Sequence, residues 1–421
     1  MNAPAPGLAC DDRVAQRYAA LYANGIIDDP WLDGSDRLCF EPEILDRPHV
    51  GALAEAAATV AMMLDEAMRA ITGDADLQRL VGIDDSLAAI ASLDAPRWLA
   101  LARADVFDVE GGGPPQVCEI NCDTPTGLAE CTELARIAAM AHPRVADPSA
   151  QLRERWVAMV RSCFDPEQAA PVVGIVDATE ITEDLCHVRL MTRWLQEAGI
   201  AVVRGSPFNL HACDRGRVGF FGTPCDVLVR HYKTDWWARR ASVWTDEPPP
   251  PHDAMLHREL ELISAAMAAG TLAVVNPWGS AIAQNKRMLA LPWERPQLFR
   301  ADTANAVRRF LPQTRFLESL AIPQLIAERA DWVLKSDYGC EGDEVLVGSV
   351  TEPQAWAEAL RLAAPGRWIV QRAFTPRRDA FGTVANRGVF LIGGLPSGIY
   401  TRRSSGPTDT RACSCPTLVR R

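Results

Sequence analysis

The sequence has 421 residues, of which 48% are hydrophobic and 23% charged, and its formal net charge at pH 7 is −11. This composition excludes a largely disordered chain, and the length predicts two or three packed subdomains. The acidic balance argues against a broad basic surface for nucleic acids or anionic membranes. Because residues 1–12 show neither the basic nor the apolar part of a signal peptide, we expect a cytoplasmic protein.

Helices are predicted in the first part of the chain. Ala, Met and Leu residues with charges spaced between them predict a long amphipathic helix over residues 52–71. A second helix is predicted over residues 84–93.

The pattern changes at residue 171. Strands are predicted at residues 172–176, 200–203 and 225–232, and a helix at residues 183–198 lies between the first two. This alternation is typical of a small open α/β sheet of the doubly wound kind. We interpret it as a subdomain that holds a substrate.

The last third predicts an α+β lobe. Two strands, residues 331–335 and 344–348, are joined by a glycine-containing turn, and a helix follows at residues 352–363. Further strands are predicted at residues 368–372 and 389–392.

Residues 117–127, a short strand that runs into a turn, form the most informative local pattern. On a strand, Glu119 and Asn121 face the same side, and Asp105 lies about a hairpin away. Two carboxylates and an amide oxygen are hard ligands that magnesium accepts. Spacing alone favours the simpler alternative, in which Glu119 lies on a solvated edge and Asn121 with Asp123 shapes the turn.

A loop that follows Lys335 contains Gly339 and Gly342. Such a loop can close over phosphates, because glycine lets backbone N–H groups approach an anion. The alternative is an ordinary hairpin turn.

Two other segments carry candidate cations. Lys286 comes shortly before a helical stretch, and Arg402 and Arg403 end a strand beyond flexible glycines, where arginines can clamp an anion. The alternative for all three is a solvated surface position.

Twelve cysteines are scattered without the spacing of a disulfide framework or of paired zinc knuckles. The densest group, Cys118, Cys122 and Cys131, has no histidine nearby. We therefore predict packing roles for these cysteines and no structural zinc.

Taken in this order, the segments resemble the glutathionylspermidine synthase family, whose synthetase domain is an ATP-grasp ligase. The most specific match is residues 119–126, which resemble the family's E-x-N-x-D-[TS]-x-[TS] segment. Residues 277–286, 335–345 and 398–402 follow in family order.

The predicted elements and the resemblance together indicate a mixed α+β and α/β fold with three units. Residues 1–170 would form an N-terminal helical and β segment that carries the magnesium and phosphate residues. Residues 171–275 would form the doubly wound substrate subdomain, and residues 276–421 the ATP-grasp nucleotide lobe.

The resemblance also implies the site residues. The catalytic arginines would be Arg103 and Arg402, and the magnesium ligands Asp105, Glu119 and Asn121. ATP would be held by Lys286, Lys335, Gly339, Cys340, Glu341, Gly342 and Gln371. The substrates would be held by Thr124 and Thr126 at the carboxylate end and by Glu183 and Asp184 at the amine or incoming nucleophile.

The implied activity is that of an ATP- and magnesium-dependent ligase, which joins a small-molecule or peptide carboxylate to an amine through an acyl phosphate. The sequence departs from the family pattern at Ser336, at Cys340 and at Pro416–Thr417, where proline, arginine and a Pro-His pair are usual. Two alternatives remain open, and the departures at Cys340 and Pro416–Thr417 favour the first of them. One is an inactive nucleotide-binding relative that acts as a partner or regulator, and the other is a small-molecule kinase.

Overall fold

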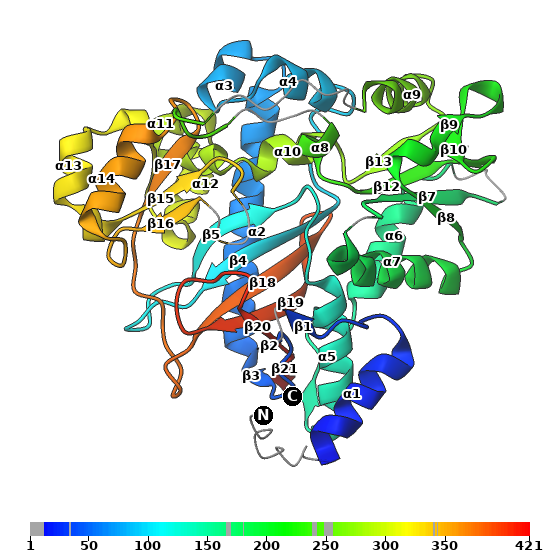
Figure 1. Cartoon of the computed structure of the whole chain (residues 1–421), viewed down its shortest axis with the longest axis horizontal. Helices are drawn as coiled ribbons and strands as arrows, with labels where there is room; N and C mark the ends of the chain where they lie inside the picture. The colour runs from blue at the N-terminus through cyan, green and yellow to red at the C-terminus, as the bar shows by residue number, and fades with distance from the viewer. Residues whose placement is uncertain are drawn as a thin grey trace, which may run out of the picture.

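The computed structural model describes residues 12–32, 35–165, 170–179, 181–237, 242–247, 256–339, 342 and 344–421. Its centre is a five-stranded antiparallel sheet in the order β20–β19–β18–β4–β5 (Figure 1). These strands are Cys413–Cys415, Leu395–Ser404, Val384–Ile392, Leu101–Phe107 and Gln116–Asn121.

The long helix α2 (Arg47–Ile71) covers one face of this sheet (Figure 1). It begins at Asp46, whose carboxylate accepts a hydrogen bond from the backbone N–H of His49 at 2.8 Å and so satisfies one free amide of the first turn. Its apolar face packs in one core with Ala102, Ala104 and Val106 of β4. Because side chains alternate along a strand, Arg103 and Asp105, which lie between these three residues, point to the opposite face.

The opposite face is shared between apolar packing and polar side chains. Helices α5 (Leu128–Ala141) and α6 (Leu152–Arg161) cover the part at Leu101, Phe390 and Ile392. Polar side chains occupy the rest of this face, towards β5.

A four-stranded parallel sheet lies to one side, in the order β13–β12–β7–β8 (Figure 1). Its strands are Ala273–Val275, Val227–His231, Val172–Asp177 and Ala201–Gly205, with helices α7 (Leu185–Glu197) and α9 (His257–Ala268) packed nearby. The α/β alternation predicted from residue 171 onward is therefore present. The run predicted as one strand at residues 225–232 is two strands, because β11 (Thr223–Cys225) joins a separate antiparallel sheet with β10 (Val218–Phe220) and β9 (Leu210–Ala212).

A second antiparallel sheet, in the order β14–β17–β15–β16, lies on the other side of the central sheet. Its strands are Thr314–Phe316, Trp368–Arg372, Trp332–Ser336 and Val345–Val347. Helices α13 (Ile322–Ala327) and α14 (Pro353–Leu362) cover its outer face around the buried Trp332, Trp356 and Trp368.

The central sheet takes strands from both ends of the chain. Strands β4 and β5 come from the range 1–170, whereas β18, β19 and β20 come from the range 276–421. The last strand, β21 (Thr417–Arg420), also returns to the N-terminal region and pairs with β3 (Glu43–Leu45) and β6 (Val145–Ala146). These two sequence ranges therefore share sheets in three dimensions.

Short helices connect these units. They are α1 (Asp12–Asn24), α3 (Ala75–Leu80), α4 (Asp85–Ala91), α8 (Thr234–Trp237), α10 (Gly279–Gln284), α11 (Leu291–Glu294) and α12 (Ala301–Phe310). Within the described residues, no helix combines the length and the apolar character needed to cross a membrane.

Candidate active site

A cavity of about 440 Å³ lies between the polar face of the central sheet and the inner face of the β14–β17–β15–β16 sheet. Eleven residues predicted from the sequence line it: Arg103, Asp105, Glu119, Asn121, Thr124, Thr126, Lys335, Gly339, Gly342, Gln371 and Arg402. Segments that lie far apart in the sequence therefore contribute residues to one cavity.

Asp105 is held between two arginines at the floor of this cavity. Its Oδ1 lies 2.8 Å from Arg103 Nε, and its Oδ2 lies 2.6 Å from Arg402 Nη2. Burial by itself raises the pKa of the Asp105 carboxyl, but the charges of Arg103 and Arg402 outweigh burial and hold the pKa well below its usual value. Asp105 is therefore ionised, and its charge is compensated in a site that water reaches poorly.

A glycine makes room for this arrangement. Gly388 of β18 pairs with Asp105, and a Cβ at Gly388 would lie 2.5 Å from Cδ of Arg103. The side chain of Arg103 therefore lies across the backbone of β18. A larger residue at position 388 would displace the guanidinium from Asp105 and from the carbonyl of Thr126, which accepts from Arg103 Nη1 at 2.8 Å.

A β-bulge aligns Glu119 and Asn121 with the arginine and the aspartate. In the β4–β5 ladder, Asp105 pairs with Glu119 and Val106 with Val117, so Cys118 is the extra residue. The register places Glu119 beside Asp105 on the cavity face, and Asn121 Nδ2 lies 3.4 Å from Glu119 Oε1.

The oxygens at this point fit a hard divalent cation. Asp105 and Glu119 supply carboxylates, and Asn121 supplies an amide oxygen. Asn386 of β18 adds a fourth group: its Nδ2 donates to Asp105 at 3.3 Å, while its Oδ1 is buried with no hydrogen-bond partner among the described residues. An amide oxygen left unsatisfied beside two carboxylates fits magnesium, which takes oxygen ligands.

The chain has only three lysines, and all three lie at this site. Lys335 on β15 is buried and donates to Gln371 Oε1 at 2.8 Å and to the carbonyl of Cys118 at 3.3 Å. Lys286 lies behind the lining, where its ammonium is 3.2 Å from Glu119 Oε2 and donates to the carbonyl of Gly339. Lys233, which follows β12, lines the cavity from the parallel-sheet side. Every other lysine or arginine position of the chain is an arginine, so the lysines of this protein are concentrated at this cavity.

The turn after β5 is anchored by a buried carboxylate. Asp123 accepts from Arg230 Nη2 at 2.6 Å and from the backbone and hydroxyl of Thr234, each at 2.7 Å. Asp123 therefore shapes the turn, as the simpler sequence interpretation suggested for it, and this anchor leaves Thr124 and Thr126 on the cavity.

Not every predicted residue reaches the cavity. Glu183 and Asp184 lie in a 3₁₀ turn before α7 and are absent from the lining, and Asp184 Oδ2 is 3.5 Å from Nε2 of His231. The two predicted loop residues Cys340 and Glu341 lie outside the described residues.

Asn386, Lys233 and Gln284 line the cavity but were not predicted. Gln284 Oε1 accepts the backbone N–H groups of Cys122 and Asp123 at 2.9 and 2.8 Å. Only Lys233 had a usable signal in the sequence, since it is one of three lysines in a chain with 43 lysines and arginines.

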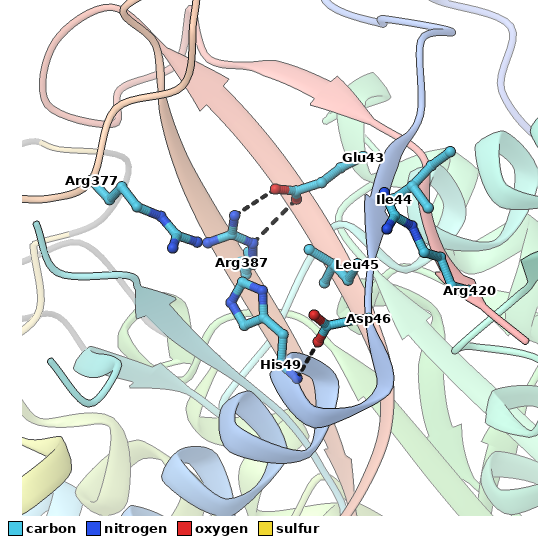
Figure 2. A pocket seen from close by; sticks show the side chains of 8 residues that line it. All are labelled: Glu43, Ile44, Leu45, Asp46, His49, Arg377, Arg387 and Arg420. Carbon is cyan, nitrogen blue, oxygen red and sulfur yellow. Dashed lines mark hydrogen bonds and ion pairs between the residues drawn. The ribbon is translucent and has the colours of Figure 1, made fainter. Parts of the chain in front are cut away.

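The far face of the central sheet carries an ion-pair network in a second cavity of about 360 Å³ (Figure 2). Glu43 accepts two hydrogen bonds from Arg387 (Figure 2). Arg387 also donates to Asp108 at 2.9 Å, and His49 Nε2 lies 2.8 Å from Asp108. Glu43 accepts in addition from Thr401, the residue before Arg402, at 3.0 Å. This network braces β18 and β19 directly behind the residues that line the first cavity.

Solved structures that are similar to this chain include two proteins named after synthetases. A glutathione synthetase-like effector from Globodera pallida, GSS30, superposes with a TM-score of 0.62 at 11% identity, over 97% of this chain and 96% of that one. A provisionally named gamma-glutamylcysteine synthetase from Methylobacillus flagellatus KT gives a TM-score of 0.46 at 12% identity, over 86% of each chain. Among curated proteins, none matches at a significant level. The model of the glutathionylspermidine synthase preATP-grasp family matches residues 36–420, nearly the full length, and the chain therefore belongs to this family.

Proposed function

We propose that the protein is an ATP- and magnesium-dependent ligase that joins a carboxylate to an amine. The observation that carries this proposal is the convergence of three lysines, the buried Arg103 and the partly buried Arg402 on one cavity, beside an oxygen cluster that fits magnesium. A polyanion such as ATP needs both cations and a metal to be held in a water-poor site.

The nucleotide would lie against the β14–β17–β15–β16 sheet. Lys335 supplies a cation for phosphates on this side, and Val333, Val347 and Phe374 give the same cavity an apolar lining suited to a planar base. Gln371 is held by Thr314 through a 3.0 Å hydrogen bond, so its amide is fixed in position.

Bound magnesium, held by Asp105, Glu119, Asn121 and Asn386, would supply positive charge to the phosphate oxygens. The remaining chemistry belongs to the side chains. Arg402 keeps one bond to Asp105 while its Nε, buried and without a partner among the described residues, is available as a donor.

A carboxylate and an amine do not condense at neutral pH, so the acid must first be activated. In the proposed reaction the carboxylate oxygen attacks the terminal phosphorus of ATP, and ADP leaves. The amine then attacks the carbonyl carbon, and phosphate leaves with an amide formed. Arg103 and Arg402 stabilise the charge on the phosphoryl group during transfer. Thr124 and Thr126 offer hydroxyls on the acid side of the cavity.

The test is ADP release against a matrix of amino acids, short peptides and polyamines, each acid alone, each amine alone and all pairs. The ligase proposal expects ADP only from certain pairs, with a product lighter by one water than its two precursors. ADP release with an acid alone indicates a kinase, and tight ATP binding with no ADP from any pair indicates an inactive relative.

A further inference from the structure

Three cysteines from opposite ends of the chain gather on the face of the central sheet away from the active site. Leu38 forms a parallel bridge with Ser414 of β20, in which Cys39 donates its backbone N–H to the carbonyl of Ser414 at 2.7 Å. Side chains alternate along both segments, so Cys39, Cys413 and Cys415 point to the same side. Because the parallel bridge pairs Leu38 with Ser414, Cys39 lies beside Cys415, and Cys413 lies two residues before Cys415 on the same side.

The surroundings of Cys39 favour a thiolate. The pKa of the Cys39 thiol is lowered, because the neighbouring Cys413 and Cys415 side chains and the charge of Arg403 together outweigh the opposing effect of burial. By contrast, burial raises the pKa of the Cys118 thiol to about 11. Cys39 and Cys413 are half-buried, whereas Cys415 is buried, so a small reagent can approach the cluster from the Cys39 side.

The arrangement suits a disulfide better than a metal. Within the described part of the chain, one group of ligand-bearing side chains brings three donor atoms within 4.8 Å of one another, and it consists of Glu130, Cys186 and His187. The sulfurs of Cys39, Cys413 and Cys415 are not such a group, so they form no closed cage, and Cys39 has two alternative disulfide partners. Adjacent β segments also hold Cα atoms at separations that a disulfide can span.

We propose that Cys39 is a modification site that reacts with a hydroperoxide and then forms a reversible disulfide with Cys413 or Cys415. The Cys39 thiolate attacks the O–O bond, a sulfur–oxygen bond forms, and the displaced alkoxide takes up a proton and leaves as an alcohol, or as water when the oxidant is hydrogen peroxide. The neighbouring thiol then attacks the sulfenic sulfur. A sulfur–sulfur bond forms, and water leaves.

The disulfide would act on the active site through one strand. Ser414, between the two acceptor cysteines, pairs with Arg402 in the β19–β20 ladder and bonds the hydroxyl of Tyr400 at 2.6 Å. The Tyr400 ring centre lies 5.8 Å from the guanidinium carbon of Arg402 and 5.9 Å from that of Arg103. A disulfide that pulls β20 toward Cys39 would displace Ser414 and, through its hydrogen bond, Tyr400, whose ring lies beside both arginines. This consequence rests on the proposed ligase function, whereas the disulfide itself does not.

The experiment treats the fully reduced full-length protein with hydrogen peroxide, blocks remaining thiols by alkylation and maps the peptides by mass spectrometry. We expect a disulfide between Cys39 and Cys413 or Cys415 before oxidation elsewhere, and its reversal by dithiothreitol. The Cys39→Ser variant should lose it, whereas Cys163→Ser, which removes another half-buried thiol, should keep it. In the double variant Cys413→Ser/Cys415→Ser, the sulfenic acid at Cys39 should persist and react with a cyclic 1,3-diketone.

Oxidation that begins at other cysteines, or a Cys39 that stays available for alkylation, would overturn the proposal. ADP release is measured in parallel on the oxidised and the reduced protein. A loss that dithiothreitol restores supports the effect on the arginines, and equal release from both forms refutes that effect while leaving the mapped disulfide in place. If the reduced protein releases no ADP with any substrate pair, the ligase function fails, and the disulfide map still decides the modification site.

Discussion

Lys335 is the cation whose loss should weaken nucleotide binding most cleanly. Its ammonium is buried on β15 and is positioned by Gln371 Oε1 at 2.8 Å and by the carbonyl of Cys118 at 3.3 Å. Both partners are neutral, so no carboxylate in direct contact would be left unpaired by its removal. The substitution Lys335→Met keeps most of the aliphatic stem and removes only the charge.

The expected magnitude follows from the contact that is lost. A hydrogen bond to a charged group contributes about 1.5–3 kcal/mol. Loss of one such bond to a phosphate should therefore raise the dissociation constant for ADP about 10- to 150-fold.

Isothermal titration with ADP in the presence of magnesium measures this directly and needs no knowledge of the acid or the amine. Arg361→Met is the matched control, because it removes an exposed cation from α14 on the outer side of the same lobe. Urea denaturation of both variants shows that they are folded. Equal ADP affinity in Lys335→Met and the wild type would refute the placement of the phosphates at this lysine.

Three further outcomes are expected. Arg402→Ala should lower ADP release roughly 10²- to 10³-fold, whereas Arg403→Ala, on the other face of the same strand, should not; equal rates in the two variants would remove Arg402 from the reaction. Asp123→Ala leaves the buried guanidinium of Arg230 unpaired, so the free energy of unfolding in urea should fall by about 3–5 kcal/mol, and an unchanged value would contradict the anchor. Burial raises the pKa of Asp94 from 3.8 to about 6; because the folded-state value is the higher one, the stabilisation is present at low pH and is lost as the pH rises through about 6. The free energy of unfolding of Asp94→Asn relative to the wild type should therefore increase by about 3 kcal/mol between about pH 3.5 and pH 7, and a pH-independent difference would contradict this.

The sequence pattern correctly predicted those helices and strands whose type is decided by local interactions. The predicted strand at residues 368–372 coincides with β17, and the predicted helix at residues 52–71 lies within α2. The helix has an apolar periodicity that packs one face in a core, whereas β17 is a short apolar run with side chains buried on both faces. The start of α2 came earlier than predicted, since the cap at Asp46 and a proline in the first turn extend the helix before its apolar run begins.

Pairing between distant strands could not be predicted from local pattern. Asn386 and Arg402 join Asp105 only because β18 and β19 return to pair beside β4. Nothing in the neighbourhood of Asn386 in the sequence marks it as a polar group beside a carboxylate. The same holds for Cys39, because only the bridge between Leu38 and Ser414 brings it beside cysteines at the other end of the chain.

The placement of Glu119 and Asn121 on one face of β5, by contrast, could be predicted from the sequence. Alternation along a strand predicted that Glu119 and Asn121 share a face, and the ladder puts both on the cavity side. The bulge at Cys118, which sets their register against β4, is a property of the pairing and was invisible in the spacing.

The central claim is that the acid is activated by phosphorylation of its carboxylate. It is tested most directly with an acid substrate identified by the ADP-release matrix and labelled with ¹⁸O in its carboxylate. The account predicts that one labelled oxygen per turnover appears in the released phosphate, because the oxygen that attacks phosphorus leaves with it when the amine attacks. Amide formation with unlabelled phosphate would contradict the acyl phosphate, and with it the roles given to Arg103 and Arg402.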